Sequence, residues 1–412
     1  MSDTFRSLFS GKTNNSAPHD IGANGHCTHA IRSQEVRPDM APGAVLRVLG
    51  VGGGGCNALQ RMVKGNVQGV EFVAVNTDVQ ALYHNNASRK ITIGRGATRG
   101  LGAGANPSIG KRAAEESTEE IKANIEGTDM LFITAGLGGG TGGGGVPIIA
   151  ELARSMGILT VGVVTMPFAF EGAKRRKNAD EALENLKGKV DTLIKIPNDK
   201  ILSLIDKTTP LTEAFQVVDE VLQHAIEGIS SLITQHGLVN VDFADVKAIM
   251  QDAGTALMGI GYGTGDSRAA EAARAAVDSP LLDTRIDGAK GILFNITGGN
   301  DLSMFEVDEA ARIITESADP DANIIFGAVV DDNFTGQVKV TVVATGFAQE
   351  EKTHAPASLV QKHLGAQRLT SGAHQKEGEE RSVIGDALFR STSLDLSEEE
   401  LEVPAFMRKK VG

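Results

Sequence analysis

The sequence contains very little cysteine. Only Cys27 and Cys56 occur among 412 residues, which excludes a disulfide scaffold and is typical of a protein kept in a reducing compartment. No run of about 18 uninterrupted apolar residues occurs, so a membrane span is not expected. Residues 1–20 also lack the apolar segment of a secretory signal. We therefore expect a cytoplasmic protein with no direct membrane insertion.

The chain also lacks an excess of basic residues. Its 40 Lys and Arg stand against 52 Asp and Glu, which gives a formal net charge of −12 at pH 7. Nucleic-acid phosphates attract basic faces, so this charge argues against nucleic-acid binding. Any anionic ligand has to be held by local features of the chain.

Two familiar ligand signatures are incomplete. The nearest match to a Walker motif, from Gly104 to Gly110, has five intervening residues, and Lys111 is followed by Arg112 rather than by Ser or Thr. Residues 1–42 are polar and without apolar periodicity, so we expect a flexible arm. The arm holds potential metal ligands without a zinc-like spacing, and we expect no protein metal site from them: His19, His26, Cys27 and His29.

Strand and helix patterns alternate over residues 43–208. Buried-strand patterns lie at 44–50, 70–78, 90–94, 129–136, 158–165 and 191–197, and helical patterns at 57–64, 107–125, 146–155 and 174–186. Asn106 before Pro107 is a good N-cap followed by proline at the first helical position. Such alternation predicts an α/β fold with a doubly wound parallel sheet.

The rest of the chain divides into four further segments. A long helical pattern fills 209–234 as a central helix, and 235–348 reads as a loop with acidic residues followed by a smaller α/β domain. Strands are expected there at 291–299, 323–330 and 339–347, and a helix at 307–318. Residues 349–400 are polar with acidic clusters, which is typical of a disordered linker. Residues 401–412 form a short apolar and then basic tail.

Glycine, with 49 residues, gathers in three turns that follow predicted strands, at 50–57, 94–107 and 136–147. Glycine lets a backbone come close to a ligand, and backbone N–H groups at a helix N-terminus bind anions. Three such turns at one sheet edge predict a phosphate-chain site, although each alone is equally well explained as a tight surface turn. Gly50, Gly52 and Gly55 with Asp78 also fit an NAD-binding fingerprint.

Many motifs in order make the chain resemble the FtsZ family of bacterial, tubulin-like cell-division GTPases. They include GVGGGGCNAL, AVNTD, GLGAGANP, GLGGGTGGGGVPIIAELA, IPNDK and GLVNVDFADV, and the tail VPAFMRKK is similar to that family's C-terminal peptide. The resemblance covers residues 44–348 and the tail. It implies a tubulin/FtsZ-like fold: a GTP-binding domain joined by a central helix to a smaller α/β domain.

The resemblance also implies a set of nucleotide-binding residues, for GTP or GDP with an associated Mg²⁺. The phosphates would be lined by Gly53, Gly54, Gly55, Cys56, Asn57, Gly139, Gly140, Thr141, Gly142, Gly143 and Gly144. Asn76 and Asp78 would lie on the γ-phosphate side, Glu171 and Arg175 at the ribose, and Asn198, Phe215 and Asp219 at the guanine. Without the family, Glu171 and Arg175 at i, i+4 would read as a surface ion pair.

The acidic loop is the implied catalytic element. By resemblance, Asp242 and Asp245, supported by Asn240, would enter the nucleotide site of the next subunit and polarise the attacking water. The protein would then assemble head to tail into filaments of a division ring, and residues 401–412 would bind membrane-tethering and regulatory partners. The competing explanation is that these acids only cap and stabilise a following helix.

Two positions depart from the family pattern. Gly143 stands where the family has Thr, which would remove a hydroxyl donor to phosphate, and Ala169 stands where Asn is common, which would loosen that edge of the site. These departures leave open a filament-forming paralogue with slow or no GTP turnover. The NAD-binding oxidoreductase is the remaining alternative.

Overall fold

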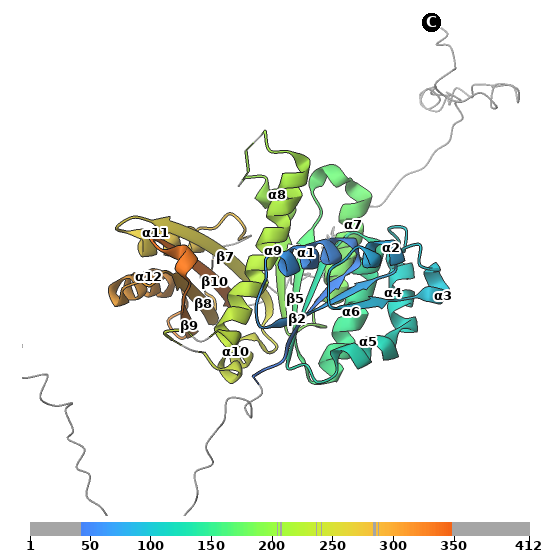
Figure 1. Ribbon diagram of the computed structural model, residues 1–412, viewed down its shortest axis with the longest axis horizontal. Helices are drawn as coiled ribbons and strands as arrows, with labels where there is room; N and C mark the ends of the chain where they lie inside the picture. The colour runs from blue at the N-terminus through green and yellow to red at the C-terminus, as the bar shows by residue number, and fades with distance from the viewer. Residues whose placement is uncertain are drawn as a thin grey trace, which may run out of the picture. The chain divides into compact units, whose positions relative to one another are not determined.

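The structure is a computed structural model that describes residues 43–203, 205–206, 208–235, 237–239, 241–282, 286 and 288–347 (Figure 1). The expected arm at 1–42 with its His and Cys residues, the linker at 349–400, the tail at 401–412 and Asn240 lie outside these residues. None of the helices in the described ranges combines the length and apolar character that crossing a bilayer requires.

The first half of the chain builds the predicted parallel sheet. Its strands are β1 (Leu46–Val51), β2 (Val70–Asn76), β3 (Arg89–Thr92), β4 (Met130–Gly136), β5 (Leu159–Met166) and β6 (Thr192–Pro197). They lie in the order β3-β2-β1-β4-β5-β6, and every neighbouring pair is parallel. β1 and β5 are buried along their whole length, as expected for a sheet covered on both faces.

Helices cover the two faces of this sheet. Val48 and Phe132 lie in one apolar cluster with α1 (Gly52–Lys64) and the central helix α9 (Leu211–Thr234). Leu49 and Leu131 face the other way, into a cluster with helices that follow β3, β4 and β5. Those helices are α4 (Pro107–Glu116), α5 (Thr118–Ile125), α6 (Gly140–Ser155) and α7 (Ala173–Leu186). The doubly wound arrangement is therefore confirmed.

The central helix joins the two halves. α9 contacts α1 and β5 on one side, and β8 (Gly291–Gly298) and β9 (Asn323–Val330) on the other (Figure 1). Its buried stripe includes Leu222, Ile226 and Ile229, which recur at helical spacing. After α9 the chain enters α10 (Phe243–Met250). The predicted central helix is thus present at residues 211–234.

The second half is the smaller α/β part. Its elements are β7 (Gly254–Thr264), α11 (Arg268–Val277), β8, α12 (Met304–Glu316), β9 and β10 (Gln337–Thr345). β7 pairs in parallel with β6 through its first residues and then antiparallel with β10. The result is one ten-stranded sheet, β3-β2-β1-β4-β5-β6-β7-β10-β8-β9. The short elements are α2 (Val79–Tyr83), α3 (Arg95–Thr98), α8 (Asn198–Ile201), η3 (Ala169–Glu171) and η4 (Asp332–Phe334).

Neither β7 nor α11 is among the elements predicted from the sequence, and for β7 the reason is glycine. Gly259, Gly261 and Gly263 alternate along β7 and face α11, whose sequence is rich in alanine. A Cβ added at Gly261 would lie 2.0 Å from the carbonyl oxygen of Ala272. The helix backbone therefore packs directly on the strand, which removes the β-branched residues that normally indicate a strand.

Helix limits also differ from the predicted ones. The expected helix at 107–125 breaks at Ser117 into α4 and α5. Asn106 does cap α4, because its Oδ1 accepts a hydrogen bond from the Ser108 N–H at 3.0 Å. α1 and α6 begin earlier than predicted, at Gly52 and Gly140, inside stretches that the glycine content predicts to be turns.

Arg268 at the start of α11 should make the stability of the second half pH-dependent. Its buried guanidinium donates to the carboxylates of Asp301 and Glu306 and thereby holds the pKa of both carboxyl groups below their usual range. A carboxyl group whose pKa is lowered by folding contributes its full stabilisation at pH values above its unfolded pKa of about 4. This contribution is lost as the pH falls through the lowered pKa of the folded state. Urea unfolding between about pH 7 and pH 3 should show that the free energy of unfolding falls more steeply with pH for wild type than for Arg268→Met. The same pH dependence for the two proteins would contradict this.

Candidate functional site

The three glycine-rich turns meet at the carboxyl edge of the parallel sheet. Gly52, with φ +71°, lies so close to the turn at 136–147 that an added Cβ would be 2.9 Å from the Gly142 nitrogen. A Cβ at Gly140 would be 2.8 Å from the Ala103 Cβ of the turn at 94–107. The Gly102 N–H also donates to the Thr77 carbonyl just after β2, at 3.1 Å. Three segments that are far apart in the sequence therefore share one edge.

Helix packing explains part of the glycine run in α6. A Cβ on Gly144 would lie 2.0 Å from the Pro107 carbonyl oxygen, and one on Gly110 of α4 would lie 2.0 Å from the Gly140 carbonyl oxygen. The backbones of α4 and α6 thus touch directly. Gly139, in contrast, has no atom within 4 Å of an added Cβ. Close packing therefore accounts for the missing side chains of Gly140 and Gly144, while their expected role at the phosphates stays a prediction.

A cavity of about 330 Å³ lies beside these turns. It is lined by residues of α1, β4, β5, α7, α8 and α9. The residues expected from the sequence that line it are Gly53, Gly54, Asn57, Glu171, Arg175, Asn198, Phe215 and Asp219. The residues that sequence reasoning missed are Gly136, Leu137, Thr165, Pro167, Val218 and Leu222. The missed residues lie at strand ends or belong to the α9 stripe, whose apolar spacing indicates only a core role.

Two polar residues, Asn198 and Asp219, are among those that line the cavity. The Asn198 side chain is 5% exposed, and its Oδ1 has no hydrogen-bond partner among the described residues. Asp219 accepts a hydrogen bond from Arg61 Nε through Oδ2, at 2.7 Å. Burial raises the pKa of Asp219 above its usual value, and the bond from Arg61 opposes this. Acceptors in this arrangement suit a ligand edge that carries N–H donors.

Aromatic rings lie beside these acceptors. Phe215 is 39% exposed and meets the ring of Phe168 edge to face, with centroids 5.6 Å apart. Phe168 in turn stacks on Phe170 at 4.9 Å. Phe215 therefore keeps an exposed surface in the cavity for a planar ligand while Phe168, which is 1% exposed, supports it from behind.

Glu171 and Arg175 form the ion pair that their i, i+4 spacing indicated. Arg175 Nε lies 3.0 Å from Glu171 Oε2, and Glu171 Oε1 accepts a hydrogen bond from the Phe168 N–H at 2.9 Å. Both side chains also line the cavity. The plain ion-pair explanation and the ligand-binding expectation are thus compatible.

Other expected residues do not line the cavity. Cys56 and Asn76 are buried, at 3% exposure each. Burial raises the pKa of the Cys56 thiol to about 12, so it is not a thiolate at neutral pH. Asp78 caps α2 by accepting hydrogen bonds from the N–H groups of Gln80 and Ala81. Thr141 pairs with the Thr77 hydroxyl at 2.7 Å.

The two positions that depart from the family pattern, Gly143 and Ala169, are not among the residues that line the cavity. A Cβ on Gly143 would lie 3.4 Å from the Ala182 Cβ, so a side chain there would point toward α7. Gly143 lines a separate cavity of about 230 Å³ with residues of α4 and α7. The Ala169 N–H donates to Asp199 Oδ1 at 2.8 Å. The consequences of Gly143 and Ala169 for nucleotide binding stay predictions.

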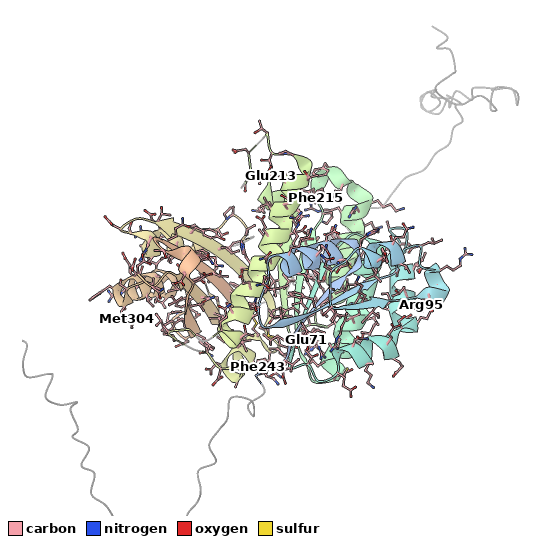
Figure 2. All side chains as sticks on the ribbon, viewed as in Figure 1. Glu71, Arg95, Glu213, Phe215, Phe243 and Met304 are labelled. Carbon is pink, nitrogen blue, oxygen red and sulfur yellow. The ribbon has the colours of Figure 1, made fainter. Side chains whose placement is uncertain are left out.

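The acidic loop lies at the other end of α9. Asp242 caps α10, with Oδ1 accepting from the Asp245 N–H at 2.8 Å, and both carboxylates are exposed. From Asp219 to the end of α9 the helix rises about 22 Å, and Figure 2 shows Phe215 and Phe243 near opposite ends of that helix. Asp242 and Asp245 therefore do not line the cavity of their own chain.

Comparison with known proteins agrees with this geometry. Residues 45–206 match the Tubulin/FtsZ family GTPase domain, and residues 254–348 match the FtsZ family C-terminal domain. An empty FtsZ dimer from M. jannaschii is 50% identical, with a TM-score of 0.71 over 74% of this chain and 88% of that one. A point mutant of FtsZ from M. jannaschii is also 50% identical, at the same TM-score, over 74% and 92%.

A more distant relative shares the fold. CetZ2 from Haloferax volcanii, solved as a GTPgS-bound protofilament, is 22% identical with a TM-score of 0.63, over 74% of this chain and 94% of that one. The NAD-binding alternative has no support here, since Asp78 is a helix cap and the matching family is a GTPase family. The chain belongs to the FtsZ family, and its first half is a Tubulin/FtsZ family GTPase domain.

Proposed function

We propose that this protein binds GTP in the cavity between α1, α8 and α9, with guanine at Asn198 and Asp219. The observation that carries the proposal is that Asn198, whose buried Oδ1 has no hydrogen-bond partner among the described residues, lines the same cavity as Asp219. Guanine presents N–H donors on the edge that would face these oxygens, whereas adenine has no matching donor pair. A buried acceptor without a partner costs about 1–3 kcal/mol, so a donor supplied by the base would favour binding.

The phosphates would lie at the N-termini of α1 and α6, where Gly53 and Gly54 are exposed and an added Cβ at Gly139 would meet no atom within 4 Å. Glu171 and Arg175 would be at the ribose. The described residues contain no group of three or more His, Cys, Asp or Glu side chains placed to hold a metal ion. Mg²⁺, which neutralises phosphate charge, would therefore be held chiefly by the nucleotide itself.

Hydrolysis would need a second copy of the chain. Asp242 and Asp245 lie at the end of α9 that is far from the cavity, so they would act on the nucleotide of a neighbouring subunit, and Asn240 would support them. There the carboxylates would orient the attacking water and accept its proton. A head-to-tail contact of this kind is heterologous and generates open filaments.

Family membership supports a proposal for the cellular role. We propose that the filaments form the division ring at mid-cell in the cytoplasm, and that residues 401–412 bind membrane-tethering and regulatory proteins. An apolar group at Val403 and Phe406 followed by Arg408 and Lys409 suits a short peptide that docks in a groove. Deleting residues 401–412 should spare filament formation and abolish tethering.

The proposed function is tested by GTP turnover as a function of protein concentration, scored beside electron microscopy for filaments. Turnover per subunit should rise with concentration, because dilution separates the acids from the nucleotide. Turnover that stays constant on dilution would contradict the shared site. Filaments without phosphate release would instead select the structural paralogue.

Adding the missing family hydroxyl should change little. Gly143→Thr is expected to alter the Kd for GTP by less than about twofold, since the side chain would extend toward Ala182 and away from the cavity. A hydroxyl that reached a phosphate would tighten binding roughly 10- to 150-fold. Equilibrium binding of GTP to the two proteins distinguishes these outcomes.

A further inference from the structure

Two turns that contribute to the cavity follow β5 and β6, beyond the last backbone pairing between these two strands. β5 and β6 are paired in register up to Met166 and Pro197. The segment after β5 then turns through η3 to Glu171, and the segment after β6 enters α8 at Asn198. Glu171 and Asn198 both line the cavity, the first at its proposed ribose side and the second at its proposed base side.

Asp199 joins these two turns through its side chain. Its Oδ1 accepts a hydrogen bond from the Ala169 N–H at 2.8 Å, and its Oδ2 accepts one from Arg176 Nη1, also at 2.8 Å. Ala169 is the first residue of η3, and Arg176 lies in the first turn of α7. One carboxylate at the start of α8 therefore holds both the turn before Glu171 and the helix that follows it.

Asp199 does not line the cavity itself. It is next to Asn198 in sequence, and its side chain is 34% exposed. Glu171 is held from the other side by the Phe168 N–H and by Arg175. The hydrogen bonds of Asp199 therefore fix η3 and the start of α7, which include Glu171, relative to Asn198.

We propose that Asp199 is a positioning residue that sets the spacing between the ribose-binding and guanine-reading sides of the cavity. This inference rests on the proposed function. It also explains how the chain tolerates Ala169, where the family commonly has Asn, because the contact uses the backbone N–H of residue 169 and needs no side chain there. Side chains that are held in place before binding lose less conformational freedom when the ligand binds.

The test is equilibrium binding of GTP to variants of the full chain. Asp199→Ala should raise the Kd about tenfold, the value of one lost charge-assisted hydrogen bond. Asp199→Asn keeps an acceptor for the Ala169 N–H and should have a smaller effect. Glu184→Ala is the matched control, because it removes an exposed carboxylate that forms a 2.6 Å ion pair on α7 without joining two turns. Its Kd should equal that of wild type.

A double-mutant cycle separates positioning from general destabilisation. In an Asn198→Ala background, Asp199→Ala should raise the Kd by less than about twofold, since the base contact that it positions is already gone. Equal factors in both backgrounds, or a wild-type Kd for Asp199→Ala, would overturn the positioning role while leaving GTP binding intact. Wild-type protein that bound no guanine nucleotide would overturn the proposed function as well.

Discussion

Replacing Asp242 or Asp245 by alanine should leave GTP binding close to wild type and slow GTP hydrolysis about 10²–10⁴-fold, the usual contribution of a general base. Binding is spared because neither residue lines the cavity of its own chain. Hydrolysis is lost because the carboxylates would reach the γ-phosphate of the neighbouring subunit. The measurements are Kd for GTP and phosphate release at a concentration where wild type forms filaments.

Asp242→Asn separates catalysis from helix capping. Asparagine caps helices about as well as aspartate, whereas alanine costs about 1 kcal/mol at such a position. The Asp242 Oδ1 that accepts from the Asp245 N–H would be retained in the variant, and only the charge would be lost. We expect wild-type stability with turnover as slow as that of Asp242→Ala. Normal turnover would mean that Asp242 serves only as the cap.

Two neighbouring glycines of α6 should respond in opposite ways to alanine. Gly144→Ala would place its Cβ 2.0 Å from the Pro107 carbonyl oxygen and 2.6 Å from the Lys111 nitrogen. Backbone atoms of α4 have no room to yield, so we expect destabilisation by about 3 kcal/mol. At Gly145 the nearest atom would be 3.7 Å away, an ordinary contact. Gly145→Ala should therefore stabilise the protein by about 1 kcal/mol through helix propensity.

Urea unfolding of the two variants beside wild type measures both effects. A loss of stability for Gly144→Ala together with a gain for Gly145→Ala would show that direct packing of α4 on α6 requires glycine at position 144. If both variants were stabilised, the α4–α6 backbone contact would not be as close as described. Equal destabilisation would mean that α6 needs glycine along the whole run for another reason.

The parallel sheet and the central helix could be predicted because their signals are local. Buried strands such as β4 and β5 are continuous apolar runs, and α9 repeats its apolar residues at helical spacing. β7 could not be predicted in this way. Its Gly259, Gly261 and Gly263 are dictated by α11, which lies against them, so the information is in the tertiary contact.

The candidate site shows the same division. Asn198, Phe215 and Asp219 were expected from the family motifs and line one cavity. The sequence does not indicate the role of Arg61, because its hydrogen-bond partner Asp219 is on another helix far along the chain. The sequence explains the glycines in α6 only in part, because a phosphate and a packed helix both favour a position without a side chain and the sequence does not distinguish them.

The shared active site is tested most directly by mixing two inactive variants. Asp242→Asn keeps the nucleotide cavity, and the double variant Asn198→Ala/Asp219→Ala keeps the acidic loop, so each alone should hydrolyse GTP very slowly. In an equal mixture, about one junction in four would pair a loaded cavity with an intact acidic loop. We predict that turnover recovers toward about a quarter of the wild-type rate. A mixture no faster than the sum of its two components would contradict the account.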